Sequence, residues 1–195
     1  LTNGSVDDID WRTDSAGTVS LATGPSVDFS LGTSSGIYLY LEASGGCTQQ
    51  TAILESGCIE LNQNYNLLVR YHMLGSDMGS LHFDIYSNGL WTQDFVSAIT
   101  GDQGNTWLTK NIDLSSYNGQ TVKLRIRGVT GQGFASDLAI DALEFQPIAP
   151  SSNPVSACDS LVSPSGNYVW NVSGSYTNTI TGSSGCDSII AYNLT

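Results

Sequence analysis

The stretch that decides the fold runs from Ser20 to Ser44 and reads SLATGPSVDFSLGTSSGIYLYLEAS. In its second half, residues 37–43, aliphatic side chains alternate with tyrosines and Glu42. Each kind therefore falls on its own face of an extended chain. A period of two is typical of a β-strand and not of a helix. The stretch thus predicts a strand that carries an acidic residue near its end.

The first half of the same stretch contains a turn followed by an acidic loop. Gly24 and Pro25 favour the turn, because glycine tolerates unusual backbone angles and proline fixes its own. Asp28 stands just past the turn, in front of a loop rich in serine and glycine. Together with Glu42, an acidic side chain on an ordered loop is a candidate corner of a cation site.

Composition and charge narrow the class of protein. Of the 195 residues only 12% are charged, against about 25% in typical domains. Such a length has room for one large β domain and a small module. The net charge of −12, with six Lys and Arg, argues against nucleic acid as a partner, because neutralising phosphates needs a basic surface. The sequence has no run of apolar residues that would insert into a membrane.

Four cysteines indicate a disulfide framework and an oxidising compartment. Three pairings are possible, and local closure favours Cys47–Cys58 and Cys158–Cys186. The spacing contains no C-x-x-C, so a zinc site is not favoured. We therefore expect a protein that is secreted or displayed at the cell surface, and a chain that is a processed or excised segment of a larger one.

Several further segments alternate with the same period of two. The clearest are residues 65–73, 81–86, 121–129 and 137–145, and Asn-Gly pairs at 88–89 and 118–119 indicate tight turns. No segment shows a clear helical period. Short strands at regular spacing, separated by turns, predict an all-β sandwich of two antiparallel sheets.

Half of the basic residues would lie on one strand face, because Lys123, Arg125 and Arg127 alternate with aliphatic residues. If this strand and those at 70–72 and 82–86 are neighbours in one sheet, they form a basic, aromatic-edged face that would attract anionic groups of a polysaccharide. In the alternative interpretation, the face is solvated and its charges pair with Asp84 and other acids. The candidate ligand-binding residues are Arg70, His72, His82, Tyr86, Lys123, Arg125 and Arg127.

Four stretches in register resemble the MAM domain, the extracellular module named after meprin, A5 and receptor phosphatase mu. They are the opening stretch from Ser20, LVRYHMLG at 68–75, GDQGNTW at 101–107 and SDLAIDAL at 136–143. The resemblance covers about residues 10–145 and implies a jelly roll of two antiparallel sheets, which agrees with the strand pattern.

Acidic residues lie where the family pattern has conspicuous acids, and the resemblance implies a structural calcium site. Calcium prefers about six to eight oxygen ligands. The candidate ligands are Asp8, Asp28, Glu42, Asp137 and Asp141. An alternative stays open, in which Asp28 and Asp137 cap turns and Asp141 accepts hydrogen bonds from backbone amides.

A proline-rich linker, residues 147–154, separates a domain at 1–146 from a small unit at 155–195. ACDS at 157–160 is echoed by GCDS at 185–188. The unit resembles a short repeat of large secreted bacterial surface proteins, which implies a spacer. About 40 residues bury little core alone, so we expect a small β module stapled by a disulfide.

The sequence contains none of the common hydrolase or nucleotide-binding motifs. We therefore predict a non-catalytic recognition module of a larger secreted bacterial protein. It would bind an anionic glycan or a surface partner beside neighbouring domains of its parent, and calcium would stabilise it. The alternatives are a protein–protein adhesion domain without glycan affinity and, third, a glycoside-acting enzyme on a jelly roll.

Overall fold

The structure is a computed structural model that describes residues 1–4, 6–148, 160–163, 165–181 and 187–194. Strands dominate it, and the helical element of the described residues is one turn of 3-10 helix, Ser115–Tyr117. No helix in these ranges has the length and apolar character needed to cross a membrane. The all-β prediction is confirmed.

Seven strands form the first sheet. Its order is β1-β4-β11-β7-β8, with β5 beside β11 and β9 beside β7. The paired strands of this sheet are antiparallel. The strands are β1 (Thr2–Asn3), β4 (Thr51–Glu55), β5 (Ile59–Glu60), β7 (Ser80–Ser87), β8 (Leu90–Thr92), β9 (Ile99–Thr100) and β11 (Thr121–Val129).

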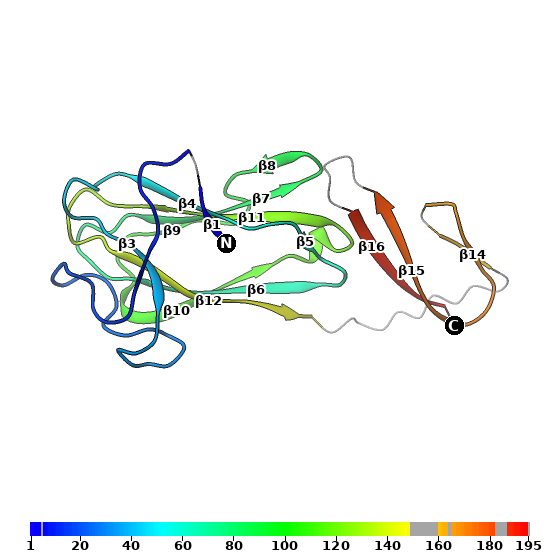
Figure 1. Cartoon of the computed structure of the whole chain (residues 1–195), viewed down its shortest axis with the longest axis horizontal. Helices are drawn as coiled ribbons and strands as arrows, with labels where there is room; N and C mark the ends of the chain where they lie inside the picture. The colour runs from blue at the N-terminus through cyan, green and yellow to red at the C-terminus, as the bar shows by residue number, and fades with distance from the viewer. Residues whose placement is uncertain (5, 149–159, 164, 182–186, 195) are drawn as a thin grey trace.

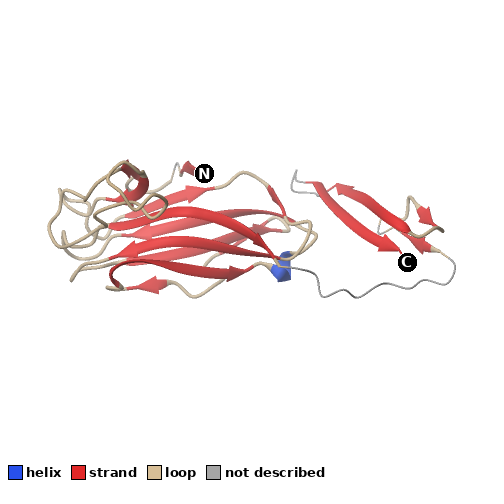
Figure 2. Ribbon diagram, turned by 90° about the horizontal axis from the view of Figure 1, so that it is seen from below, coloured by secondary structure: helices blue, strands red, loops and turns tan. Residues whose placement is uncertain are grey.

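Five strands form the second sheet, in the order β10-β6-β12-β3-β2, again antiparallel. Its members are β2 (Arg12–Asp14), β3 (Tyr38–Leu41), β6 (Tyr65–Met73), β10 (Gly104–Asp113) and β12 (Leu138–Pro147). Figure 1 shows the two sheets stacked as layers, and Figure 2 looks onto the broad side of the strands, which run lengthwise. This is the predicted sandwich of two sheets.

The core fills the space between the layers. Alternate residues of β6 and of β11 face it, because successive side chains of a strand point to opposite sides. The centre of β11 shows how tightly the layers approach. A Cβ on Gly128 would lie 2.4 Å from the Leu41 Cδ1 atom and 2.9 Å from the Trp11 ring, so only glycine fits there.

The strand at the end of the deciding stretch is buried on both faces. Leu41 faces the main core, whereas Tyr38 and Tyr40 form a second buried cluster with Ala139, and Trp107 packs against it. Ile37, predicted to share the face of Leu41, lies before the strand begins and is 64% exposed. The strand therefore covers fewer residues than the alternating stretch of the sequence, residues 37–43.

The C-terminal residues form two small antiparallel pairs. They are β13 (Leu161–Val162) with β14 (Val169–Trp170), and β15 (Gly174–Thr181) with β16 (Asp187–Leu194). The Trp170 ring stacks on Tyr176 at 4.9 Å between centroids and also contacts Tyr192. Most of the predicted linker, with Cys158 and Cys186, lies outside the described residues, so the domain boundaries and that disulfide stay predictions.

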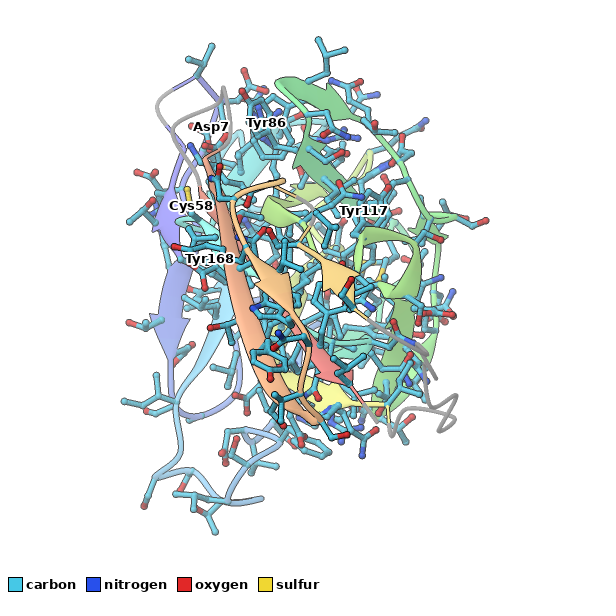
Figure 3. All side chains as sticks on the ribbon, turned by 90° about the vertical axis from the view of Figure 1, so that its right-hand side faces the viewer. Asp7, Cys58, Tyr86, Tyr117 and Tyr168 are labelled. Atoms are coloured by element: carbon cyan, nitrogen blue, oxygen red, sulfur yellow. The ribbon has the colours of Figure 1, made fainter. Side chains whose placement is uncertain are left out.

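The predicted Cys47–Cys58 bridge is wrong, because Cys47 is a free cysteine. The two residues lie near opposite ends of β11. The Thr130 hydroxyl donates to the Cys47 carbonyl, whereas Ile59, next to Cys58, pairs with Val122. Eight residues of strand span roughly 25 Å, and a disulfide needs Cα atoms within about 7 Å. Figure 3 labels Cys58 in the view from the β5 end of the sandwich.

Candidate functional site

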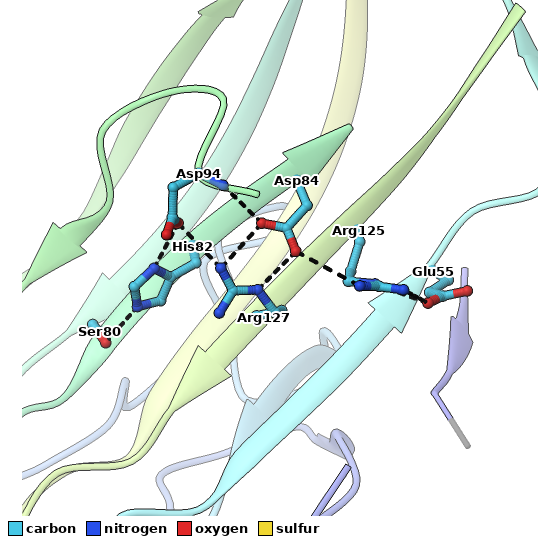
Figure 4. A network of polar contacts seen from close by, with 7 residues as sticks. All are labelled: Glu55, Ser80, His82, Asp84, Asp94, Arg125 and Arg127. Carbon is cyan, nitrogen blue, oxygen red and sulfur yellow. Dashed lines mark hydrogen bonds and ion pairs between the residues drawn. The ribbon is translucent and has the colours of Figure 1, made fainter. Parts of the chain in front are cut away.

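A network of charged residues covers the outer face of the seven-stranded sheet (Figure 4). It forms because β7 and β11 are neighbours whose outward residues are in register, with Arg125 opposite Asp84 and Arg127 opposite His82. The loop after β8 adds Asp94. We call this set the ionic network: Glu55, Ser80, His82, Asp84, Asp94, Arg125 and Arg127.

Asp84 is the centre of the ionic network and is fully buried. Arg127 binds its carboxylate in a bidentate manner, with Nε donating to Oδ2 at 2.7 Å and Nη2 donating to Oδ1 at 3.1 Å. The backbone amide of Asp94 also donates to Asp84, at 3.0 Å. Hydrogen bonding to Asp84 raises the pKa of the Arg127 guanidinium, against the opposing effect of burial. The pair is thus held in a fixed geometry.

The outer members of the network are more exposed. Arg125 donates to Glu55 through Nη2 at 2.6 Å and through Nε at 2.8 Å. The His82 ring joins Asp94 Oδ1 at 2.7 Å through Nδ1 and the Ser80 hydroxyl at 2.8 Å through Nε2. Three carboxylates therefore surround the two arginines, and the face is not a basic patch. The pairing of charges with Asp84 and other acids, which the alternative interpretation expected, is present, and ligand binding at this face stays a prediction.

A groove of about 570 Å³ runs over this face. One wall is the N-terminal segment around β1, and Gln93 comes from the loop after β8. The floor is formed by β4 and β11, with both arginines of the ionic network. The lining residues are Thr2, Asn3, Gly4, Val6, Ile53, Glu55, Gln93, Arg125 and Arg127.

Aromatic rings adjoin the groove at β7 and β8. The Arg125 guanidinium lies 4.0 Å from the centroid of the Trp91 ring, and Trp91 contacts Tyr86 at 5.4 Å. The Lys123 ammonium lies 5.6 Å from the Tyr86 ring. Cation–π contacts of this kind hold both the cations and the rings in place.

Arg70 and His72 do not share this face, which corrects the prediction of a single ligand-binding surface. Both lie on β6, in the other sheet. The alternation of side chains indicated which side of its strand each residue takes, but not which layer holds the strand. His82, Tyr86, Lys123, Arg125 and Arg127 do come together on β7 and β11.

His72 is 2% exposed, so no ligand reaches it from solvent. Its Nε2 atom lies 3.0 Å from Asn105 Oδ1, and the Trp107 ring packs against it at 5.6 Å. Burial lowers the pKa of this imidazole, against the hydrogen bond to Asn105. Arg70 donates to the Thr109 hydroxyl and stacks on the Phe29 ring. Arg70 thus contacts the loop before β3, whereas His72 contacts residues of β10.

All five predicted metal ligands accept hydrogen bonds from backbone amides. Asp8 accepts from Thr51, at 2.9 Å. Asp28 accepts from Leu31 at 2.7 Å and Thr33 at 3.2 Å. Asp141 accepts from Phe29 at 2.9 Å and Ser30 at 3.2 Å. Carboxylates used in this way stabilise loops, as the alternative interpretation held for Asp28 and Asp141.

Glu42 and Asp137 do come together, at the start of β12 beside the end of β3. Asp137 is fully buried; its Oδ1 atom accepts from the Ala43 amide at 3.0 Å, and its Oδ2 atom has no hydrogen-bond partner. The Thr18 hydroxyl and the Glu42 carboxyl lie beside the Asp137 carboxyl. Within the described ranges no three acidic, histidine or cysteine side chains gather as a metal site. A cation here would take two carboxylates, and its other ligands would be hydroxyl, carbonyl or water oxygens.

The two carboxyls differ in their affinity for a proton. Burial raises the pKa of Asp137 to about 6, more than hydrogen bonds from Ala43 and Thr18 lower it. Burial also acts to raise the pKa of Glu42, but hydrogen bonds from Ser44 and Ser20 outweigh it and leave that pKa lowered. A buried pair with one unpartnered oxygen fits either a shared proton or a bound cation.

We predict that acid stabilises the cation-free protein through Asp137. A carboxyl whose pKa is raised on folding contributes stability that is fully present below the unfolded value and is lost as the pH rises through about 6. In a chelator, lowering the pH from 7.5 to 5 should therefore raise the free energy of unfolding by about 1.4 kcal/mol more in the wild type than in Asp137→Asn. Urea titrations of both proteins measure this difference, and equal pH responses would contradict it.

Sequence reasoning missed Asp94, which joins the ionic network, and Gln93, which lines the groove; both come from a loop whose pattern does not place it on the sheet. It also missed Asp7, which accepts from the Ile53 amide at 2.7 Å and fastens the N-terminal wall of the groove. The alternation of TAILE, residues 51–55, could have placed Glu55 on the face opposite the core.

The fold and the groove together define a β-sandwich recognition module. The chain belongs to the MAM domain family (meprin/A5/mu), and the model of that family matches residues 1–149. Neuropilin-1a of Danio rerio is 31% identical over 145 residues, which are 69% of this chain and 15% of that protein. The chain thus spans a small part of that relative's length.

Solved structures with a similar fold have low sequence identity to this protein. The K1 cleaved adhesin domain of Lys-gingipain from Porphyromonas gingivalis W83 is 17% identical, with a TM-score of 0.44 over 75% of this chain and 87% of that one. The TmCBM61 module, solved with β-1,4-galactotriose, is 12% identical, with a TM-score of 0.43 over 71% of this chain and 88% of that one.

Proposed function

We propose that this chain is a non-catalytic recognition module that binds an uncharged stretch of a glycan in the groove over β4 and β11. The observation that carries the proposal is the pairing of donors and acceptors along the groove floor. Arg125 and Arg127 offer N–H donors, and Glu55 offers a carboxylate acceptor. Sugar hydroxyls both donate and accept, so such a floor matches them.

The rigidity of the floor supports binding. Both arginines are held by carboxylates of the ionic network, so little side-chain freedom is lost when a ligand arrives. Because the network already balances their charge, an anionic sugar gains little over a neutral one. Trp91 and Tyr86 beside the groove offer aromatic surface for the apolar face of a sugar ring.

For the same domain we propose a calcium ion at Glu42 and Asp137. The fit rests on the buried, unpartnered Asp137 oxygen and on the second carboxyl beside it. A bound calcium ion would neutralise both carboxylates. Ser20 donates to Glu42 at 3.1 Å, and Thr23 Oγ1 accepts from the Asp137 amide at 2.8 Å. These contacts would then join residues 18–24 to the ends of β3 and β12 more firmly.

The proposed setting is a larger secreted bacterial protein in which neighbouring domains carry this module to a polysaccharide or surface partner. A module that lacks enzyme motifs and belongs to this family suits targeting or adhesion better than catalysis. A binding partner that is a protein is the alternative outcome, and the screen below separates the two.

The groove is tested by a glycan array in calcium buffer, followed by calorimetry with the best ligand. Gln93→Ala should weaken binding at least tenfold, because one hydrogen-bonding side chain of the wall is removed. Gln146→Ala is the matched control, since Gln146 is exposed on β12 of the other sheet and should bind like the wild type. Failure of both neutral and anionic glycans to bind would overturn the proposal, as would equal losses in the two variants.

A further inference from the structure

A second cavity, of about 190 Å³, lies between the sheets at the end of the sandwich that carries β5 (Figure 1), and the exposed Leu1 is part of its lining. Both sheets contribute to its walls. From the five-stranded sheet come residues of β6 and β12, and from the seven-stranded sheet residues of β7 and β11. The apolar wall residues of these four strands are Leu67, Leu143, Phe145, Phe83, Leu124 and Ile126. We call this space the apolar cavity.

The polar residues on its lining are already paired with other groups of the protein. The Ser56 hydroxyl donates to the Gly57 carbonyl at 2.8 Å and accepts from the Leu124 amide at 2.8 Å. Asp84 and Arg125 are paired in the ionic network. The polar side chains of the lining therefore already have partners, and most of the lining is apolar.

An apolar cavity in a close-packed protein excludes water and can admit an apolar molecule of matching size. Water needs two to four polar partners to be stable in a cavity, so an apolar cavity stays dry. Engineered apolar cavities of about 150 Å³ bind benzene. The walls here include the flat rings of Phe83 and Phe145, with Phe95 from the loop after β8. Rings in such walls favour a flat guest through edge-to-face and stacked contacts.

We propose that the apolar cavity binds a small, flat, apolar molecule in the size range from benzene to indole. The apolar cavity shares Arg125 with the glycan groove, but its other lining residues are different ones and most of its apolar walls belong to the core. Its test reads out those core residues and does not depend on the proposed function.

The test titrates indole, and in parallel benzene, into the full chain with selectively labelled methyl groups. Saturable shifts are expected for Leu67, Leu124 and Ile126, whose side chains line the cavity. Benzimidazole, which has the shape of indole with one more polar nitrogen, should bind at least tenfold more weakly, because that nitrogen would lose its water without gaining a partner. No saturable shift up to the solubility limit of both probes would overturn the proposal.

A cavity-filling variant identifies the site. Leu143→Trp should abolish the indole shifts, because Leu143 is a partly exposed wall residue that can bring a larger ring into the space. Leu108→Trp is the control: Leu108 packs against the core from β10 but does not line the apolar cavity, and indole binding should persist. Indole binding that survives Leu143→Trp, or is lost equally in Leu108→Trp, would place the ligand elsewhere and reject the proposal.

Discussion

Replacing Asp84 by alanine should lower the free energy of unfolding by about 3–5 kcal/mol, which is the cost of removing one partner of a buried ion pair. Asp84 is fully buried and is bound by the Arg127 guanidinium, whose side chain is 16% exposed. Without the carboxylate that cation has only the exposed Asp94 nearby, and the Asp94 amide loses its acceptor. Urea unfolding followed by tryptophan fluorescence gives the value.

Glu55→Gln is the matched control for Asp84→Ala. Glu55 also accepts from an arginine, but its side chain is 36% exposed, so its loss should cost less than about 1 kcal/mol. The double variant Asp84→Leu/Arg127→Met, in which apolar residues replace the pair, should recover much of the stability. If the two single substitutions lowered the free energy of unfolding equally, burial of the carboxylate would not determine how much each ion pair stabilises the protein.

Calcium should raise the melting midpoint of the protein by about 5–10 °C. A ligand present at a hundred times its dissociation constant stabilises by about 2.7 kcal/mol, and each kcal/mol shifts the midpoint of a domain of this size by about 2–4 °C. Asp137→Asn should remove the shift, because the buried oxygen without a hydrogen-bond partner becomes part of a neutral amide. In a chelator the same variant should be at least as stable as the wild type at pH 7.5, since no charge is then buried. Scanning calorimetry with and without calcium measures both effects.

Asp28→Asn and Asp141→Asn distinguish this two-carboxylate site from the five-residue site expected from sequence. Both carboxylates accept backbone amides, so both substitutions should destabilise the protein. The calcium shift should nevertheless persist, because neither residue adjoins Asp137. Loss of the shift in either variant would restore the larger site, and an unchanged midpoint of the wild type in calcium would reject the ion altogether.

The sandwich could be predicted because each long strand has a local sequence pattern that identifies it as a strand. In β11 apolar and polar residues alternate from Thr121 to Arg127, and in β6 only Leu68 interrupts the alternation from Asn66 to Met73; the predicted ranges 65–73 and 121–129 are the ranges found. The layer that each strand joins depends on pairing between residues far apart in the chain. The alternation of residues along one strand does not say which sheet the strand joins. Arg70 was therefore predicted beside Arg125, although the core separates them.

The candidate sites show the same division. The sequence places acids on loops, but only the folded loops decide which carboxylates meet amides and which are left facing each other. Asp28 lies three residues before its amide partner Leu31, whereas Asp141 acts across 112 positions. A register shift with a bulge between Asp141 and Leu143, where Ala142 has φ of +39°, helps to aim the Asp141 carboxylate. No local pattern of residue types contains that geometry.

The loop between Asp28 and β3 has a consequence for protein engineering. It is held at its base through backbone amides, by Asp28 and Asp141, and by the Trp107 indole donating to the Val27 carbonyl. Gly36 must stay glycine, since a Cβ there would collide with the Asp28 carboxylate. Leu31, Ser34 and Ser35, by contrast, point to solvent. Randomising these three positions would turn the loop into a display site on a scaffold whose anchors are left untouched.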